Sequence, residues 1–139
     1  MKRLLLDINI VLDVLLNRQP HAGASAAVWA AVEAGTVEGL LAAHAVTTVH
    51  YLVRKELGNA GAKRTVEALL RVYRVAAVDG VVIQFALDLS SSDFEDAVTA
   101  AAARLAGCDA IVTRDPKGFR GSPVRCLPPE AVPPLLAAR

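Results

Sequence analysis

The chain has 139 residues, and its 15 Lys and Arg residues nearly balance its 14 Asp and Glu residues, leaving a formal net charge of +1. This length fits one domain over residues 1–139, and the hydrophobic fraction of 54% excludes an intrinsically disordered chain. The near-neutral charge argues against a protein that coats nucleic acid by bulk electrostatics. No apolar run approaches the roughly 18 uncharged residues of a membrane-spanning helix, so no membrane span is expected.

The N-terminal stretch MKRLLLDINIVLDVLL imitates a secretory signal peptide, because Lys2 and Arg3 precede an apolar run. Acidic residues interrupt that run and no small-residue cleavage site follows, so a mature, cytoplasmic N-terminus is expected. The two cysteines, Cys108 and Cys126, form no metal-binding motif and lie in apolar contexts, which favours buried, unreactive thiols.

Short apolar runs, which predict buried strands, alternate with apolar residues at helical spacing, which predict helices. In chain order, the first half of the chain is expected to form a strand at 3–6, helices at 10–16 and 22–34, a strand at 39–43, and helices at 45–57 and 60–73. Gly35 and Gly58 are expected to end the helices that precede them.

The second half continues the alternation, with a strand at 74–78, helices at 81–89 and 94–105, strands at 109–113 and 124–127, and a short helix after Pro128 and Pro129. Ser92 and Glu95 have the spacing of a capping box at the start of the helix over 94–105. Strands that alternate with helices predict one α/β domain with a mostly parallel sheet.

Acidic residues fall where such a sheet binds ligands, outside the carboxyl ends of its strands. Asp7 closes the first strand, Asp115 lies just beyond the strand that ends near residue 113, and Asp96 lies in the first turn of the preceding helix. Parallel topology can bring these three carboxylates to one edge. Three negative charges in one cleft repel one another unless a cation binds or a carboxylate is protonated. Hard oxygen donors without His or Cys favour Mg²⁺ or Mn²⁺ as that cation. Such a site suits phosphodiester hydrolysis.

Nearby polar residues have other interpretations. Asp93, one turn before Asp96, is a typical helix N-cap and could also join the acidic site. Asn9 could hold the loop of Asp7 or a water bound to the metal. Asp13 is expected on a solvated face or at a helix end.

The segments LLLDINIVLDVLL and SSDFEDAVTAAAARLAGCDAIVTRDPKGF, with the closing strand and its prolines, resemble the PIN-domain ribonucleases, in particular the VapC-like toxins. The resemblance covers nearly the whole chain. It implies a three-layer α/β/α fold with a central parallel sheet, Mg²⁺- or Mn²⁺-dependent cleavage of single-stranded RNA, and often an antitoxin partner and a homodimer. It assigns the catalytic and metal-binding acids to Asp7, Asp96 and Asp115, and the small hydroxyl residue beside the site to Thr113.

The chain departs from the family pattern at two positions. The family's helical acid after the second strand falls on Thr48, and the acid that often follows the last site residue falls near Gly118. Two interpretations follow. Asp93, Thr48 or His50 substitutes in part and leaves a live nuclease, or the domain binds RNA or a protein partner without cutting.

Basic and aromatic residues suggest how RNA is held. Arg114 and Lys117 flank Asp115 and are the expected phosphate contacts. Tyr51 and Trp29 could stack on bases, although Trp29 among small helical residues favours a core or interface position. Small apolar residues on the second helix suggest a dimer or antitoxin surface, namely Ala24, Ala27 and Val28.

Other α/β phosphate enzymes fit the sequence less well. A receiver domain would have paired acids after its first strand, whereas this chain has Asp7-Ile8-Asn9. A phosphatase with an Asp nucleophile would have a second Asp at position 9, where Asn9 stands. No glycine-rich turn follows the first strand, which disfavours a dinucleotide-binding domain.

Overall fold

The computed structural model describes residues 1–138 of the chain. Five parallel strands form one sheet in the order β3-β2-β1-β4-β5. Their bounds are β1 Arg3–Leu6, β2 Glu38–Ala42, β3 Arg74–Ala76, β4 Ala110–Val112 and β5 Cys126–Leu127. Crossover connections join these parallel strands: α-helices make the connections up to β4, and the 3₁₀ turn of residues 116–119 with its flanking loops joins β4 to β5.

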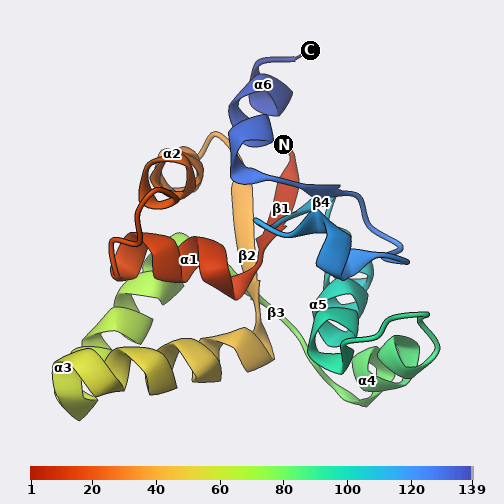
Figure 1. Cartoon of the computed structure of the whole chain (residues 1–139), viewed down its shortest axis with the longest axis horizontal. Coiled ribbons are helices and arrows are strands. Elements are labelled where there is room, and N and C mark those ends of the chain that lie inside the picture. The colour runs from red at the N-terminus through yellow and green to blue at the C-terminus, as the bar shows by residue number, and fades with distance from the viewer. Residues whose placement is uncertain (139) are drawn as a thin grey trace.

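Helices cover both faces of the sheet (Figure 1). One face carries α1 Ile8–Leu15, α2 Ala22–Glu33, α3 Ala43–Val72 and α6 Val132–Ala137, and the other carries α4 Gly80–Leu87 and α5 Phe94–Leu105. Two 3₁₀ turns, η1 Pro116–Phe119 and η2 Pro129–Ala131, complete the chain. This arrangement confirms the predicted three-layer α/β/α fold with a parallel sheet.

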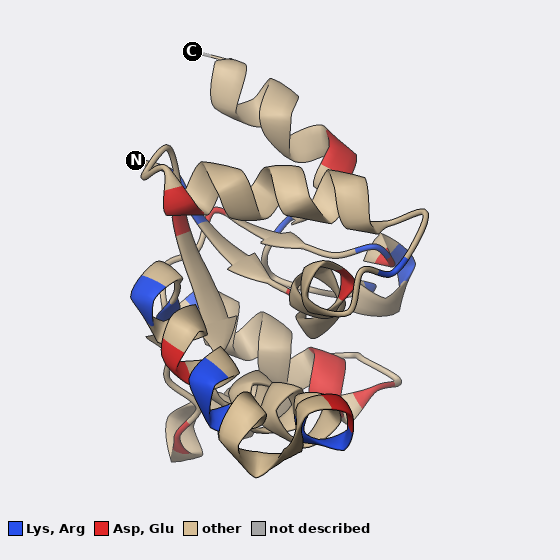
Figure 2. Ribbon diagram, turned by 90° about the vertical axis from the view of Figure 1, so that its left-hand side faces the viewer, with Lys and Arg blue, Asp and Glu red and all other residues tan. Residues whose placement is uncertain are grey.

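The central strand shows why the N-terminal apolar run folds in this way. Leu4 and Leu6 pack into the core beneath α1, α2 and α3, whereas Leu5 packs against α4 and α5. A strand covered on both faces needs apolar side chains at every position. In Figure 2, Lys and Arg are interspersed with Asp and Glu over helices and loops, and the strands are mostly uncharged.

The interruption of α3 agrees with one local expectation. Gly58, with φ +72° and ψ 178°, breaks the helical backbone of Ala43–Val72 where the sequence predicts that one helix ends before the next begins. Two other expectations need correction. The capping residue of α5 is Asp93, whose carboxylate accepts from the backbone N–H of Asp96, rather than Ser92. Val28, expected on an exposed patch of α2, is fully buried in the core.

The aromatic residues follow their packing. Trp29 packs edge-on against the buried ring of Tyr73, with ring centroids 5.3 Å apart, and is partly buried at the edge of the core. Tyr51 is half exposed on α3, with Lys55 Nζ 4.5 Å from its ring centroid. Cys108 and Cys126 are free and half-buried, and burial raises the pKa of both thiols, which keeps them in the unreactive protonated form.

Within residues 1–138, none of the helices is both long enough and apolar enough to cross a membrane.

Candidate active site

The structure brings the predicted acids to one pocket at the carboxyl edge of the sheet. Asp7 follows β1, Asp115 follows β4 after two residues, and Asp96 lies in the first turn of α5. The pocket has a volume of about 200 Å³ and is lined by Asp7, Ile8, Asn9, Asp93, Glu95, Asp96, Thr113, Asp115 and Phe119. Carboxylates far apart in the sequence meet there because β1 and β4 are adjacent, parallel strands.

Asp7 is held by the strand beside it. Its backbone N–H donates to the carbonyl of Val112 at 2.9 Å, and its Oδ2 accepts from the hydroxyl of Thr113 at 2.9 Å. Burial raises the pKa of Asp7 above its ordinary value, while the Thr113 hydroxyl and the positive charge of Arg114 act in the opposite direction. Hydrogen bonds therefore hold Asp7 in place, and the Thr113 hydroxyl and the charge of Arg114 favour its ionised form.

Asp96 is partly buried among the other acids of the pocket, and its pKa is raised. Burial and the negative charges of Asp93, Asp7, Glu95 and Asp115 raise its pKa to about 6. Each further ionised carboxylate makes the next one harder to ionise. A bound cation would reverse this repulsion.

Asp115 is the third of the predicted acids that line the pocket. Its backbone N–H donates to Thr113 Oγ1 at 3.1 Å, and its carboxylate caps η1 by accepting from the N–H of Gly118. A Cβ on Gly118 would lie 2.8 Å from Asp115 Oδ2 and 3.4 Å from Asp96 Oδ2. The missing side chain at position 118 thus leaves room between two of the pocket acids.

The other predicted residues divide into two groups. Asn9 and Asp93 line the pocket, and Asn9 Oδ1 accepts from Arg18 at 3.3 Å. Thr48 and His50 are not among the pocket residues, and the Thr48 hydroxyl donates to the carbonyl of His44 at 3.4 Å on its own helix. The α3 helix therefore contributes no carboxylate to this pocket.

Glu95 is a pocket residue that sequence reasoning missed. Its spacing from Ser92 indicates only a capping box, yet Glu95 lines the pocket and its charge raises the pKa of both Asp7 and Asp96. Its position in the first turn of α5, between Asp93 and Asp96, was the available signal.

Asp13 is a second residue whose expected environment was wrong. It is fully buried, not solvated. Its Oδ2 accepts from the Ser25 hydroxyl at 3.0 Å and lies 2.8 Å from Arg114 Nε, and its Oδ1 accepts from Arg114 Nη2 at 3.1 Å. A buried carboxylate needs such partners, because an unpaired one is expensive to remove from water.

Two observations bear on whether a metal fits the pocket. The polar donors of the pocket are hard oxygens, which suit Mg²⁺ or Mn²⁺. The pKa of Asp96 is raised first by burial and then by the charges of the neighbouring acids, and a cation would offset both effects. Across residues 1–138, no three His, Cys, Asp or Glu side chains stand close enough, as placed, to hold a metal ion. The donor chemistry fits a hard divalent cation, whereas the side chains as placed do not form a closed ligand cluster.

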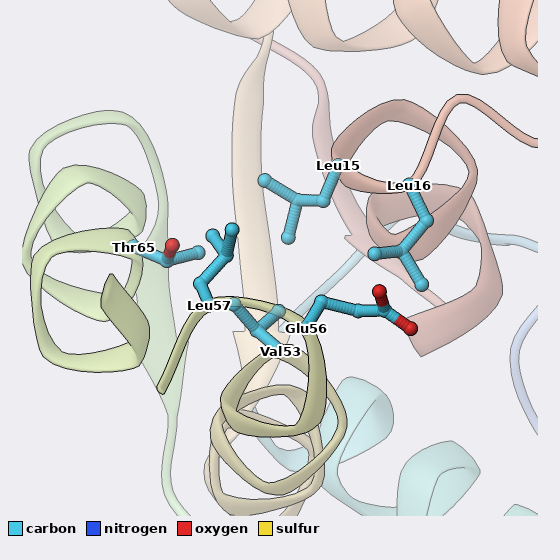
Figure 3. A pocket seen from close by; sticks show the side chains of 6 residues that line it. All are labelled: Leu15, Leu16, Val53, Glu56, Leu57 and Thr65. Carbon is cyan, nitrogen blue, oxygen red and sulfur yellow. The ribbon is translucent and has the colours of Figure 1, made fainter. Parts of the chain in front are cut away.

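A second cavity, of about 360 Å³, lies between the end of α1 and the bend in α3 (Figure 3). It is lined by Leu15, Leu16, Val53, Glu56, Leu57 and Thr65. Apolar side chains dominate it and Glu56 is its one charged group, so it offers no set of groups for hydrolysis.

Comparisons with known proteins agree with this geometry. A family model described as PIN domain matches residues 3–117. A search of curated protein sequences returned no match. A chain of the FitAB complex bound to an IR36 DNA fragment is similar in structure, with 20% identity, a TM-score of 0.72, and coverage of 91% of this chain and 95% of that chain.

Two further structures share the fold. A chain of DNA-bound VapBC from Salmonella typhimurium has 14% identity and a TM-score of 0.70, with 93% of this chain and 99% of that chain covered. VapC20 from Mycobacterium tuberculosis, described as a Sarcin-Ricin loop cleaving toxin, has 18% identity and a TM-score of 0.61, with 78% and 86% covered. The family match over most of the sequence, the shared fold and the acidic pocket at the sheet edge show that the chain belongs to the PIN-domain family.

Proposed function

We propose that this protein is a divalent-metal-dependent endoribonuclease that hydrolyses single-stranded RNA and acts as the toxin of a toxin–antitoxin pair. The observation that carries the proposal is the meeting of Asp7, Asp96 and Asp115, from three separate elements, in one pocket of hard oxygen donors. Membership of the PIN-domain family supports it.

The proposed metal ligands are Asp7, Asp96 and Asp115. Glu95 is a fourth carboxylate of the pocket, to which α3 contributes none. When bound, Mg²⁺ or Mn²⁺ would lower the pKa of a water and offset the charge that develops on the phosphodiester. The chain itself orients the reacting groups: Thr113 holds Asp7 by a hydrogen bond, Asp93 caps the helix that carries Asp96, and Asn9 borders the pocket.

Lys117 is the proposed phosphate contact. It is exposed on η1, two residues after Asp115. The guanidinium of Arg114, the other basic residue expected to meet RNA, is engaged by Asp13, and its role is taken up in the next subsection.

The partner proposals rest on relatives. Similar structures include FitAB and VapBC complexes and one described as a toxin–antitoxin complex from Klebsiella pneumoniae. We extend this to the present chain as an antitoxin partner, a homodimer and a cytoplasmic location. Mixing the purified protein with its candidate antitoxin and measuring mass by light scattering would test the first two.

A second candidate function is an RNA- or protein-binding module that does not cleave. The observation that favours it is the absence of acids at Thr48 and Gly118, because fewer carboxylates hold a metal less tightly. Titration calorimetry with Mn²⁺ separates the two: no binding at millimolar metal would favour the non-cleaving module.

The decisive experiment compares Asp7→Asn with Asp88→Asn, an exposed acid at the end of α4 that lies outside the pocket. Cleavage of a single-stranded RNA in Mn²⁺, with an EDTA control, should be lost in Asp7→Asn and kept in Asp88→Asn. Undiminished, metal-dependent cleavage by pure Asp7→Asn would refute the assignment.

A further inference from the structure

The buried ion pair between Asp13 and Arg114 joins two parts of the active site. Asp13 lies on α1, the helix that begins directly after Asp7. Arg114 lies between Thr113, whose hydroxyl donates to Asp7, and Asp115, whose backbone N–H donates to that same hydroxyl. The pair therefore connects the helix that follows one site acid to the turn that carries another.

These contacts form a closed frame. Asp7 leads through α1 to Asp13, Asp13 contacts Arg114, and the turn of residues 113–115 returns to Asp7 through the Thr113 hydroxyl. The Ser25 hydroxyl of α2 also donates to Asp13 Oδ2, but it lies outside the loop of contacts that joins Asp7 to Asp115. A closed frame of this kind fixes the distance between Asp7 and Asp115, which are otherwise joined only through adjacent strands.

Two features distinguish Arg114 from an RNA contact. Its guanidinium already faces both carboxylate oxygens of Asp13, and its side chain is only 29% exposed. If the guanidinium left Asp13 to meet a phosphate, Asp13 would remain as a buried, unpaired charge, which is strongly unfavourable. Lys117 and other exposed basic residues carry no such penalty.

We propose that Asp13 is a positioning residue, which holds Arg114 and thereby sets the placement of Asp115 and Thr113 relative to Asp7. The inference rests on the proposed metal-dependent cleavage, since positioning matters for the carboxylates that would hold the ion. Mutation of residues that orient metal ligands without touching the metal commonly lowers metal affinity or turnover by about 10- to 100-fold.

The test compares Asp13→Asn with Ser25→Ala. Asp13→Asn keeps the size of the side chain and removes its charge, whereas Ser25→Ala removes only one hydrogen bond to the same carboxylate. We expect Asp13→Asn to lower both the Mn²⁺ affinity, measured by calorimetry, and kcat by about 10- to 100-fold. The KM for RNA should be unchanged. Ser25→Ala should match the wild type in both quantities after correction for any change in melting temperature.

A measurement without metal adds an independent readout. The backbone N–H of Asp115, which bonds to Thr113 Oγ1, should exchange with solvent faster in Asp13→Asn than in Ser25→Ala. A purely stabilising role for the ion pair would instead speed exchange throughout the core.

Arg114→Lys decides the matter if Asp13→Asn does not fold, because it keeps the charge and loses the planar fork. A positioning role predicts weaker Mn²⁺ binding at an unchanged KM. A raised KM, with the salt dependence of RNA binding reduced by about 0.7 in log–log slope, would overturn the inference and make Arg114 a phosphate ligand. A wild-type protein that neither binds Mn²⁺ nor cleaves RNA would overturn the proposed function, whereas active wild type with an unaffected Asp13→Asn would overturn this inference alone.

Discussion

The hydroxyl of Thr113 lies 2.9 Å from Oδ2 of Asp7 and donates to it across 106 residues of sequence. The hydroxyl oxygen of Thr113 also accepts from the backbone N–H of Asp115 at 3.1 Å. Thr113 is fully buried. Its hydroxyl therefore bonds to both Asp7 and Asp115 without competition from solvent, and it fixes the two pocket acids relative to each other. The relation makes Thr113 as informative a target as the acids themselves.

Thr113→Val should impair the site more than the fold. The change keeps the shape of the side chain but leaves Asp7 Oδ2 without a donor and the Asp115 N–H without an acceptor. We expect Mn²⁺ affinity to fall about 10- to 100-fold and the free energy of unfolding to fall by about 1–2 kcal/mol, measured by calorimetry and urea denaturation. Thr113→Ser, which retains the hydroxyl, should retain most of the Mn²⁺ affinity; equal losses in both variants would contradict the prediction.

The stability of the metal-free protein should depend on Asp96. Its pKa in the folded state is raised to about 6, whereas an unfolded Asp titrates near pH 4, so the folded state holds this proton more tightly. The free energy of unfolding should therefore decrease as the pH rises from about 4 to 6, and stay lower above that window. Urea denaturation across this range measures the effect.

The Asp96→Asn variant should lose this contribution to the pH dependence, whereas Asp88→Asn should keep it. Saturating Mn²⁺ should also remove the decrease in the wild type, because a cation favours the ionised carboxylates. An Asp96→Asn protein with the wild-type pH profile would rule out Asp96 as the source.

Gly118→Asp should add a carboxylate where the family pattern often has one. A Cβ at position 118 would lie 2.8 Å from Asp115 Oδ2, which must shift to make room, and 3.4 Å from Asp96 Oδ2, so the new carboxylate would lie beside two of the pocket acids. We expect Mn²⁺ affinity to rise roughly three- to tenfold, measured by calorimetry. Gly118→Ala provides the steric control, and an equal effect of both variants would show that charge plays no part.

Gly58→Ala should destabilise the bend in α3. Gly58 has φ +72° and ψ 178°, a backbone region almost confined to glycine, where an L side chain costs about 1–3 kcal/mol even though the space around it is open. Gly23→Ala in α2 is the matched control, because Gly23 also has open space around it but lies in an ordinary helical turn. Thermal denaturation should show a loss of stability for Gly58→Ala and a gain of up to about 1 kcal/mol for Gly23→Ala.

Much of the fold could be predicted because it follows from local chemistry. Apolar runs such as residues 3–6 predict strands buried on both faces, and the observed β1 has these bounds. Element ends were harder to predict, since β3 ends at Ala76 rather than at residue 78 and β5 is confined to Cys126–Leu127. Hydrogen bonds formed with neighbouring elements decide those ends.

The positions of Asp7, Asp96 and Asp115 were predictable for a similar reason. Each follows a strand or begins a helix, and a parallel sheet gathers such positions at one edge. Glu95 was missed because its spacing from Ser92 also fits a cap, and a capping pattern and a ligand position look alike in one dimension.

The amino-acid sequence alone determined the layered fold, because apolar patterns of strand and helix spacing alternate along the chain. It also determined the sheet edge that holds the pocket, because acids follow the predicted strands or begin a helix. The environment of Asp13 is not local. Its partner Arg114 is 101 residues away, and its burial depends on how α1 and α2 pack beside the turn after β4. Only the tertiary structure decided that this charge is buried and paired, because the energy of a charge depends on which groups surround it in space.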